Sequence, residues 1–526
     1  MQRAPLIHNP LLSRQRFLQL TAAGAAGAAT LGTGLSAHAG ERAAAPKRGG
    51  ILRLGQVGDV LAFDGPAVSD NTSIWTMLLI YDQLTRPTAD GLNVEPSLAQ
   101  SWDISPDGKI YTFHLRRDVK FHDGSPMTAE DVKFSYDRAL KGVSFLFAAF
   151  KDMEVVDQFT VRAHLKRPHA PFLTDVAIYS VSILPKKLVL SMGKKFFDHP
   201  IGTGPFMLKS WAKGSQIVLS RNPGHFRGPK PYVDEIHQVI VPDPNSRILQ
   251  VQNGELDVAL FVPPAVAGSL QQNPSVTLHV DNFFDSHFIC IQTASKPWFG
   301  DKLVRQAMNY AVDKDAIVKH LLSGFGEASG QAIPKMFGYN EAVRPYPFDL
   351  AKAKALMAAS KYPKGFATSI LVDASTTVPD KQIAEFVQQS LKPLNIDVSI
   401  EIVDDATFTS RTFGPKFEMN VQYMTSDIID PDELMGFAVV PGAGSDALWT
   451  YYKNPAIDRM ATQAAGILDR GQRQRLYGQI DAVHHDDAPM IFLYHAPSLS
   501  VTSAKLQGFK VLTTGNYRLE ECWFSS

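Results

Sequence analysis

Residues 94–136 read VEPSLAQSWDISPDGKIYTFHLRRDVKFHDGSPMTAEDVKFSY, and this stretch decides the fold. The dipeptide Asp107-Gly108 lies between two apolar segments, and apolar residues alternate with polar ones after it, which predicts a tight turn followed by a half-buried strand. A second Asp-Gly turn follows. Thr128, with Asp131 three positions later, forms a capping-box pattern that predicts the start of a helix. The stretch therefore predicts a hairpin, a turn and a helix.

The order of these residues resembles the signature of the family 5 extracellular solute-binding proteins, which deliver peptides, nickel chelates and other solutes to bacterial ABC importers. Further blocks that resemble this family, including its dipeptide- and oligopeptide-binding members, lie at residues 49–54, 200–206, 221–228, 254–257 and 305–317. The resemblance covers essentially the whole mature chain. It implies a receptor that binds a ligand and hands it over without changing it.

The first 46 residues differ in composition from the rest of the chain. They carry arginines, no acidic residue before Glu41, and a run rich in alanine and glycine, which together indicate a signal peptide over residues 1–39. Residues 13–18 resemble the twin-arginine export motif, with Gln15 at the place of the second arginine, so both this route and Sec export stay open. We expect release into the periplasm.

Composition limits the class of protein. Lys+Arg and Asp+Glu are both 52, a balance that argues against nucleic acid or an anionic membrane as the main partner. After the leader, no apolar run approaches the roughly 20 residues that cross a bilayer. At 526 residues, two or three domains are expected. The two cysteines, Cys290 and Cys522, lie in apolar strand-like contexts, and they either pair or stay as buried thiols.

The resemblance implies an α/β, two-lobed periplasmic-binding-protein fold with an extra inserted domain and a ligand cleft between the lobes. The predicted parts are lobe I (47–84, 204–282 and 492–526), the inserted domain (85–203) and lobe II (283–491).

The second half of the chain shows a strand–helix–strand rhythm of its own. Residues 369–373 predict a short strand, Asp380 begins a helix, and residues 398–402 and 419–423 alternate like strands, with a short helix at 408–412 between them. This order predicts a mixed or largely parallel sheet covered on both faces. Asp301 predicts the start of a helix that runs to Leu322.

The loop after the strand that ends at Tyr423 is the predicted ligand contact. Ligands of open α/β sheets bind beyond the carboxyl ends of strands, and Thr425, Ser426 and Asp427 lie there. The D-x-x-D-P pattern from Asp427 resembles the segment whose first aspartate holds the α-ammonium group in peptide-binding members. A carboxylate in a closing cleft needs a positive partner, so Asp427 predicts a ligand with a cationic group. The alternative is that Asp427 caps a helix, the structural role that we assign to Asp430.

Other candidate contacts are Trp449, followed by Tyr451 and Tyr452, as stacking aromatics, and Phe63, Asp64 and Arg411 as cleft residues. Residues 374–380 contain no arginine or lysine. Their lack of a cation argues against dipeptides, if the carboxylate-clamping arginine of dipeptide receptors is expected there.

The sequence argues against metal binding and catalysis. The cluster His484-His485-Asp486-Asp487 holds adjacent histidines, which point in different directions on a helix and do not meet at one metal. The motifs HExxH, CxxC, GxxxxGK and GxSxG are absent, so no enzyme and no cofactor are predicted. We expect a monomeric receptor for a peptide or amine-bearing solute, with an ABC permease as partner. The alternatives are a nickel chelate or an oligosaccharide on the same scaffold, and a sensor or hydrolase role.

Overall fold

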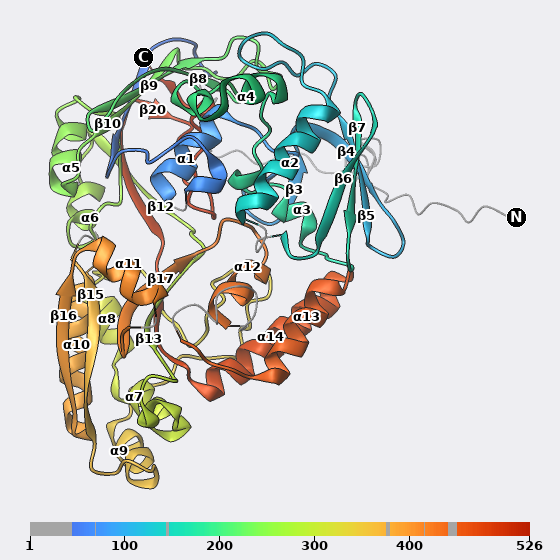
Figure 1. Cartoon of the computed structure of the whole chain (residues 1–526). Helices are drawn as coiled ribbons and strands as arrows, with labels where there is room; N and C mark the ends of the chain where they lie inside the picture. Colours follow the sequence, from blue (N-terminus) through green and yellow to red (C-terminus); the bar gives the residue numbers. More distant parts are fainter. Residues whose placement is uncertain are drawn as a thin grey trace, which may run out of the picture. The chain divides into compact units, whose positions relative to one another are not determined.

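The computed structural model describes residues 45–525 except residues 69, 144–146, 375–378, 415 and 440–449 (Figure 1). The predicted signal peptide, residues 1–39, lies outside the described residues. Among the described residues, no helix is both long and apolar enough to cross a membrane.

The stretch 94–136 has the predicted structure. Strands β4 (Ala99–Ile104) and β5 (Ile110–Leu115) form an antiparallel hairpin, and helix α2 spans Ala129–Val143. Gly108 at the turn has a φ of 66°, which glycine adopts without strain. The Thr128 backbone N–H donates to Oδ2 of Asp131 over 2.9 Å, the reciprocal bond of a capping box.

The hairpin belongs to a four-stranded antiparallel sheet in the inserted segment. Its order is β4, β5, β7 (Thr160–Leu165) and β6 (Phe150–Asp157). Helix α2 packs on β6 (Figure 1). The segment also contains the helices α3 (Phe172–Asp175) and α4 (Lys186–Met192), and a two-stranded ribbon of β2 (Thr85–Pro87) and β3 (Val94–Pro96). Tyr111 and Phe172 lie 4.8 Å apart between ring centroids in its core, which is continuous with that of the next sheet.

A seven-stranded sheet combines strands from three separate parts of the chain. Its order is β12 (Val276–Asp281), β19 (Ser498–Ser503), β11 (Val258–Leu260), β1 (Ile51–Gln56), β10 (Glu235–Ile240), β9 (Gln216–Arg221) and β8 (Phe206–Ala212). Strand β1 pairs in parallel with both β10 and β11. The helices of this part are α1 (Asn71–Ile80), α5 (Pro244–Gln252) and α6 (Pro264–Gln271), and a short ribbon joins β20 (Leu506–Gln507) to β21 (Trp523–Phe524).

Two glycines allow a close approach at the end of α1. A Cβ at Gly202 would lie 2.0 Å from the carbonyl oxygen of Ile80, and the backbone N–H of Gly204 donates to that oxygen over 2.9 Å. No other residue type fits Gly202 without moving the backbone, which explains the glycines of the 200–206 block.

A six-stranded sheet fills most of the second half of the chain. Its order is β14 (Glu327–Ala328), β18 (Met490–His495), β13 (Asp285–Ile291), β17 (Met419–Thr425), β15 (Phe366–Asp373) and β16 (Ile396–Val403). Strand β15 pairs in parallel with β16 and β17, whereas β13 is antiparallel to its neighbours, so the predicted mixed sheet is confirmed.

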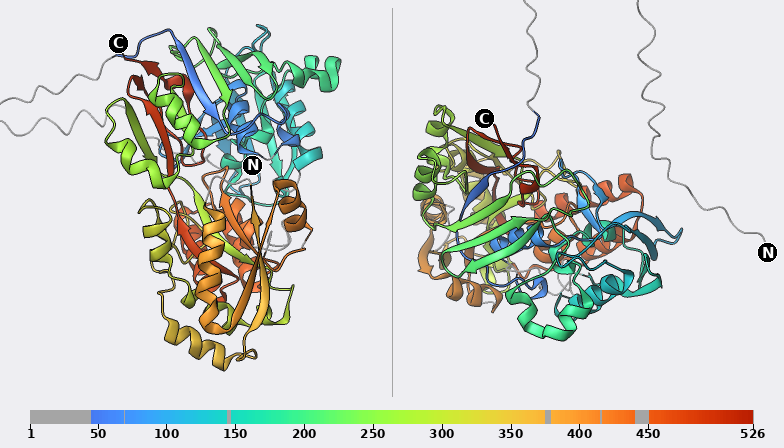
Figure 2. Two further views of the ribbon diagram at one scale, coloured as in Figure 1. Left: turned by 90° about the vertical axis from the view of Figure 1, so that its left-hand side faces the viewer. Right: turned by 90° about the horizontal axis from the view of Figure 1, so that it is seen from above.

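Helices cover this sheet, and its two faces bury different cores. Its helices are α7 (Lys302–Ala311), α8 (Lys314–His320), α9 (Leu350–Ala359), α10 (Asp380–Leu391), α11 (Asp405–Phe413), α12 (Asp432–Leu434), α13 (Pro455–Gly466) and α14 (Arg470–Asp487). Helix α10 lies along β15 and β16 (orange in Figure 2). Ile289 and Ile291 of β13 belong to one core, and Phe288 and Cys290 to the other.

The prediction of a single helix from Asp301 to Leu322 is wrong, because this stretch forms two helices. Asp301 caps α7 as predicted, but Val312 is extended, with φ −94° and ψ 118°, and ends that helix. The Asp313 carboxylate then accepts from the backbone N–H of Ala316 and starts α8.

The division into lobes stays a prediction. One of its boundaries, at residue 492, can be compared with the positions of the strands. The boundary at residue 492 falls inside β18, which pairs with β13 of the six-stranded sheet. The chain changes sheets between His495 and Ser498, so we move this boundary to about residue 496.

Both cysteines are buried free thiols, and burial raises the pKa of each. A buried thiol that resists ionisation reacts slowly. We expect an aromatic disulfide reagent to detect about two thiols per chain in denaturant and almost none in native buffer, as measured by absorbance. A count near zero in denaturant without reductant would instead indicate a disulfide.

Candidate binding cavity

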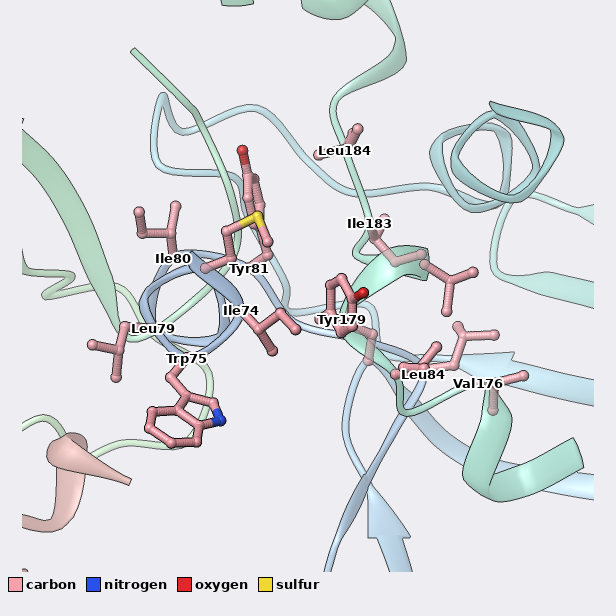
Figure 3. Packing of buried hydrophobic residues seen from close by; sticks show 14 of the residues in the cluster. Ile74, Trp75, Leu79, Ile80, Tyr81, Leu84, Val176, Tyr179, Ile183 and Leu184 are labelled. Carbon is pink, nitrogen blue, oxygen red and sulfur yellow. The ribbon is translucent and has the colours of Figure 1, made fainter. Parts of the chain in front are cut away.

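A cavity lies beside helix α1. Helix α1 contributes Ile74, Trp75 and Leu78, and the chain after it, the η3 turn (Tyr179–Val181) and the C-terminal segment 512–520 supply most of the remaining lining. Figure 3 shows Ile74 projecting from α1 toward Tyr179, and Trp75 projecting from another side of the same helix.

Asp427 is the one lining residue that comes from residues 283–491 of the described chain. Strand β17 ends at Thr425, so Asp427 follows the carboxyl end of a strand in the six-stranded sheet. The backbone N–H groups of Asp427 and Ile428 donate to Oε2 of Glu433, over 2.8 and 3.2 Å. These bonds hold the loop against α12, and they leave the Asp427 carboxyl group at the cavity.

The electrostatics of the Asp427 side chain are those of a carboxyl group without a positive partner. Burial raises the pKa of Asp427. Burial, and then the charge of Asp427, also raise the pKa of Glu433. In the described part of the chain, no lysine, arginine or histidine pairs with Asp427. Because an unpaired charge is costly to bury, a cation from outside the protein would stabilise this site.

The neighbours predicted with Asp427 have different environments. The Ser426 hydroxyl is buried and can donate to the carbonyl of Ile428 over 2.7 Å or to Glu433 over 3.0 Å. Thr425 ends β17 and is partly buried. Tyr423 is exposed and stacks on His287 at 5.6 Å. None of the three lines the cavity, so only Asp427 of this group does.

Asp430 has a structural role, but not the predicted helix cap, because the residue at the N-cap of α12 is Pro431. Its two oxygens each accept from the Arg473 guanidinium over 2.7 Å, and Oδ1 also accepts from the backbone N–H of Asp432 over 3.1 Å. Both side chains of the pair are buried. The pair fixes the loop after Asp427 to helix α14.

Phe63, Asp64 and Arg411 do not line this cavity. Phe63 is fully buried and packs edge-on against Trp211. Asp64 pairs through both oxygens with Arg138 of α2. Arg411 donates to Glu401 and to the carbonyl of Lys416. The structure gives these three residues packing and ion-pair roles in place of the predicted ligand contacts.

The three aromatic residues predicted as ligand contacts have different environments. Trp449 lies outside the described residues. Tyr452 is buried, and its hydroxyl donates to Asp487 and accepts from Asn454, which makes it part of the protein framework rather than the cavity. Tyr451 adopts a left-handed backbone conformation, with a φ of 52°.

The histidine pair of α14 points in two directions, as predicted. His484 is buried between Tyr452 and Phe492, and burial lowers its pKa to about 3. His485 stacks on Tyr346 and its Nδ1 donates to the carbonyl of Gly330. Within the described residues, no group of three or more metal-ligating side chains comes together.

Several cavity residues were missed from the sequence. Trp75 and Tyr179 lie in apolar segments that resemble ordinary core. Glu433, which bonds to the Asp427 loop without lining the cavity, had a signal: acidic residues cluster after Ser426, and no lysine or arginine lies between Lys416 and Lys453. The charges of Asp427 and Glu433 add to the effect of burial in raising the pKa of Tyr179, which places its ring beside the carboxyl pair.

Known proteins share this architecture. Residues 93–446 match the family described as bacterial extracellular solute-binding proteins, family 5 Middle. The dipeptide-binding protein of Escherichia coli (strain K12) is 30% identical over 476 residues, which cover 84% of this chain and 88% of that protein. The periplasmic binding protein DppA of Helicobacter pylori, solved with the peptide STSA, has a TM-score of 0.82 and 29% identity, covering 91% and 99% of the two chains. NikA of Brucella suis, solved with Fe(III)-EDTA, has a TM-score of 0.82 and 25% identity, covering 90% and 100%.

Proposed function

Because the chain belongs to family 5 of the bacterial extracellular solute-binding proteins, we propose that it captures a peptide or another amine-bearing solute for an ABC importer. The observation that carries this proposal is Asp427, a half-buried carboxyl group at the cavity without a cationic partner among the described residues. An ammonium group would supply the missing charge. Relatives named for dipeptide binding and solved with a peptide support the same ligand class.

Capture would use closure about the two segments that join the sheets, residues 282–284 and 496–497. Side chains and backbone link these segments: Oδ1 of Asp285 accepts from the N–H of Ala496 over 3.0 Å, and Nδ1 of His495 donates to the carbonyl of Asp285 over 2.8 Å. Hinges of this kind are short segments that absorb a backbone rotation.

Two contacts between the inserted segment and residues 283–491 support a closed state. The N–H of Ala170 donates to the carbonyl of Ala465 over 2.7 Å, and His169 lies 3.8 Å from the carboxylate of Asp432. A ligand that binds better to the closed state shifts the population toward it. The closed form would then dock on the permease, and we propose that the receptor works in the periplasm as a monomer without catalysis.

Mass spectrometry of the small molecule that copurifies with the mature protein tests the proposal. We expect denatured wild-type protein to release a peptide or amine, and Asp427→Ala protein to release much less of it, because the ammonium loses its partner. A metal chelate or sugar retained equally by both proteins would leave the receptor class intact and overturn the amine ligand.

A further inference from the structure

The arginines that line the cavity are already neutralised by carboxylates of the protein. The pairs are Arg86 with Glu95 (2.7 Å) and Glu520 (3.4 Å), Arg227 with Asp82 (2.8 Å), and Arg518 with Glu95 (3.3 Å). Three guanidinium groups thus face three carboxylates, so their charges cancel. A ligand carboxylate that entered the cavity would have to break one of these pairs or stay unpaired, and both choices are unfavourable.

The loop that carries Asp427 holds two carboxyl groups without a cationic partner in the described chain. Oε2 of Glu433 accepts from the backbone N–H of Asp427 over 2.8 Å, so the two carboxyl groups share one short loop. Neither pairs with a lysine, arginine or histidine of the described chain. The segments between residues 45 and 525 that the structure does not describe contain none of these three residue types. Of the two, Asp427 lines the cavity, and it brings a carboxyl group that no cation of the described chain balances.

A neutral donor completes the lining. Trp75 is 5% exposed, and its indole Nε1 has no hydrogen-bond partner among the described residues. Figure 3 shows the nitrogen edge of this ring on the side where Tyr179 lies. Buried donors are almost always paired, so this N–H is suited to a ligand oxygen. A carbonyl or amide oxygen satisfies it without bringing a second charge.

From these three observations we propose that the cavity selects ligands of net positive charge: an ammonium group at Asp427, joined to neutral acceptors rather than to a free carboxylate. The inference rests on the proposed function and deepens it, because it separates amine cations and peptide amides from zwitterionic peptides. Selection arises by repulsion as well as attraction, since the cavity offers no unpaired guanidinium to an anion.

Titration calorimetry with three trialanine probes at pH 7.0 tests the proposal on the mature wild-type protein. The probes are the C-terminal amide, the free peptide and the N-acetylated free acid, whose net charges are about +1, 0 and −1. We expect the amide to bind at least about ten-fold more tightly than the free peptide, and the acetylated acid not to bind. This ratio is about 1.4 kcal/mol or more.

A matched pair of variants locates the effect. Asp427→Asn removes the carboxyl charge that this loop brings to the cavity, and we expect it to bring the amide and free peptide within about three-fold of each other. Asp397→Asn removes an exposed charge from β16 and should leave the ratio unchanged. Thermal unfolding of both variants, with a Tm no lower than that of wild type, shows that the loop is still folded.

The outcomes separate the two proposals. A free peptide that binds as tightly as its amide, or more tightly, overturns selection for net charge and leaves the amine receptor standing. A ratio that survives in Asp427→Asn overturns the role of Asp427 in this selection. If none of the three probes binds, the peptide receptor itself is overturned, and the selection with it.

Discussion

Replacing Asp427 by asparagine is expected to lower the affinity for an amine ligand by about 100-fold and to make the unliganded protein more stable. Removing one partner of a buried charge pair costs roughly 2–5 kcal/mol of binding free energy. Without ligand, burial raises the pKa of Asp427 because its charged form lacks a partner, so a neutral amide relieves that cost. We expect the Tm of the empty variant to rise by roughly 2–4 °C.

Calorimetry and thermal unfolding together measure this pair of opposite effects. Asp405→Asn, an exposed change in the first turn of α11, is the matched control and should alter neither quantity. A variant that loses stability along with affinity would indicate a structural role for Asp427. An unchanged affinity would remove Asp427 from the binding site.

The same carboxyl group makes binding depend on pH. Its neighbours are Glu433, which shares its loop, and Tyr179, whose hydroxyl donates to the carbonyl of Val68. Because burial raises the pKa of Asp427, a proton competes with the ligand ammonium as the pH falls. Affinity should therefore decrease toward acidic pH in the wild type and vary less in Asp427→Asn, as followed by calorimetry.

Replacing Arg473 by methionine is expected to lower the free energy of unfolding by about 3–5 kcal/mol, the usual cost of leaving a buried charge without its partner. The Arg473 guanidinium donates to both oxygens of Asp430, to the carbonyl of Ala464 and to the hydroxyl of Tyr477. All of these bonds are buried, so water cannot replace them easily. We also expect the loop that carries Asp427 to become more mobile when the ion pair between Asp430 and Arg473 is lost.

Denaturant unfolding of three variants tests this expectation. Arg475→Met changes an exposed arginine of the same helix and should cost less than about 0.5 kcal/mol. The double variant Asp430→Asn with Arg473→Met should recover part of the loss, because it removes the stranded carboxylate and keeps an acceptor for the N–H of Asp432. Equal losses at Arg473 and Arg475 would contradict a buried ion pair.

Local sequence predicted local structure well. The hairpin, turn and helix of residues 94–136 depend on bonds between residues near in sequence, such as that from Thr128 to Asp131. The helix predicted from Asp301 to Leu322 shows the limit. Its apolar pattern continues through Val312, and only the capping of α8 by Asp313 breaks the chain into two helices.

The candidate site was predicted only in part, because most of its residues come from distant segments. Asp427 could be found, since the end of a strand in an α/β sheet is a known position for a ligand contact. Asp64 and Arg411 could not be excluded, because their partners Arg138 and Glu401 are chosen by packing. Trp75 could not be found, because an indole in the apolar helix α1 reads as core until its unpaired nitrogen is seen beside a cavity.

The sequence by itself determined the family, the α/β class and the carboxyl group that should meet a ligand, because these depend on local patterns and on one conspicuous loop. Only the tertiary structure decided which charges are free. Folding places a carboxylate against each of Arg86, Arg227 and Arg518, which come from separate segments of the chain. Folding also places Asp427 and Glu433 side by side without a described cation, since charge balance in a cavity depends on distances between segments that the chain order does not specify.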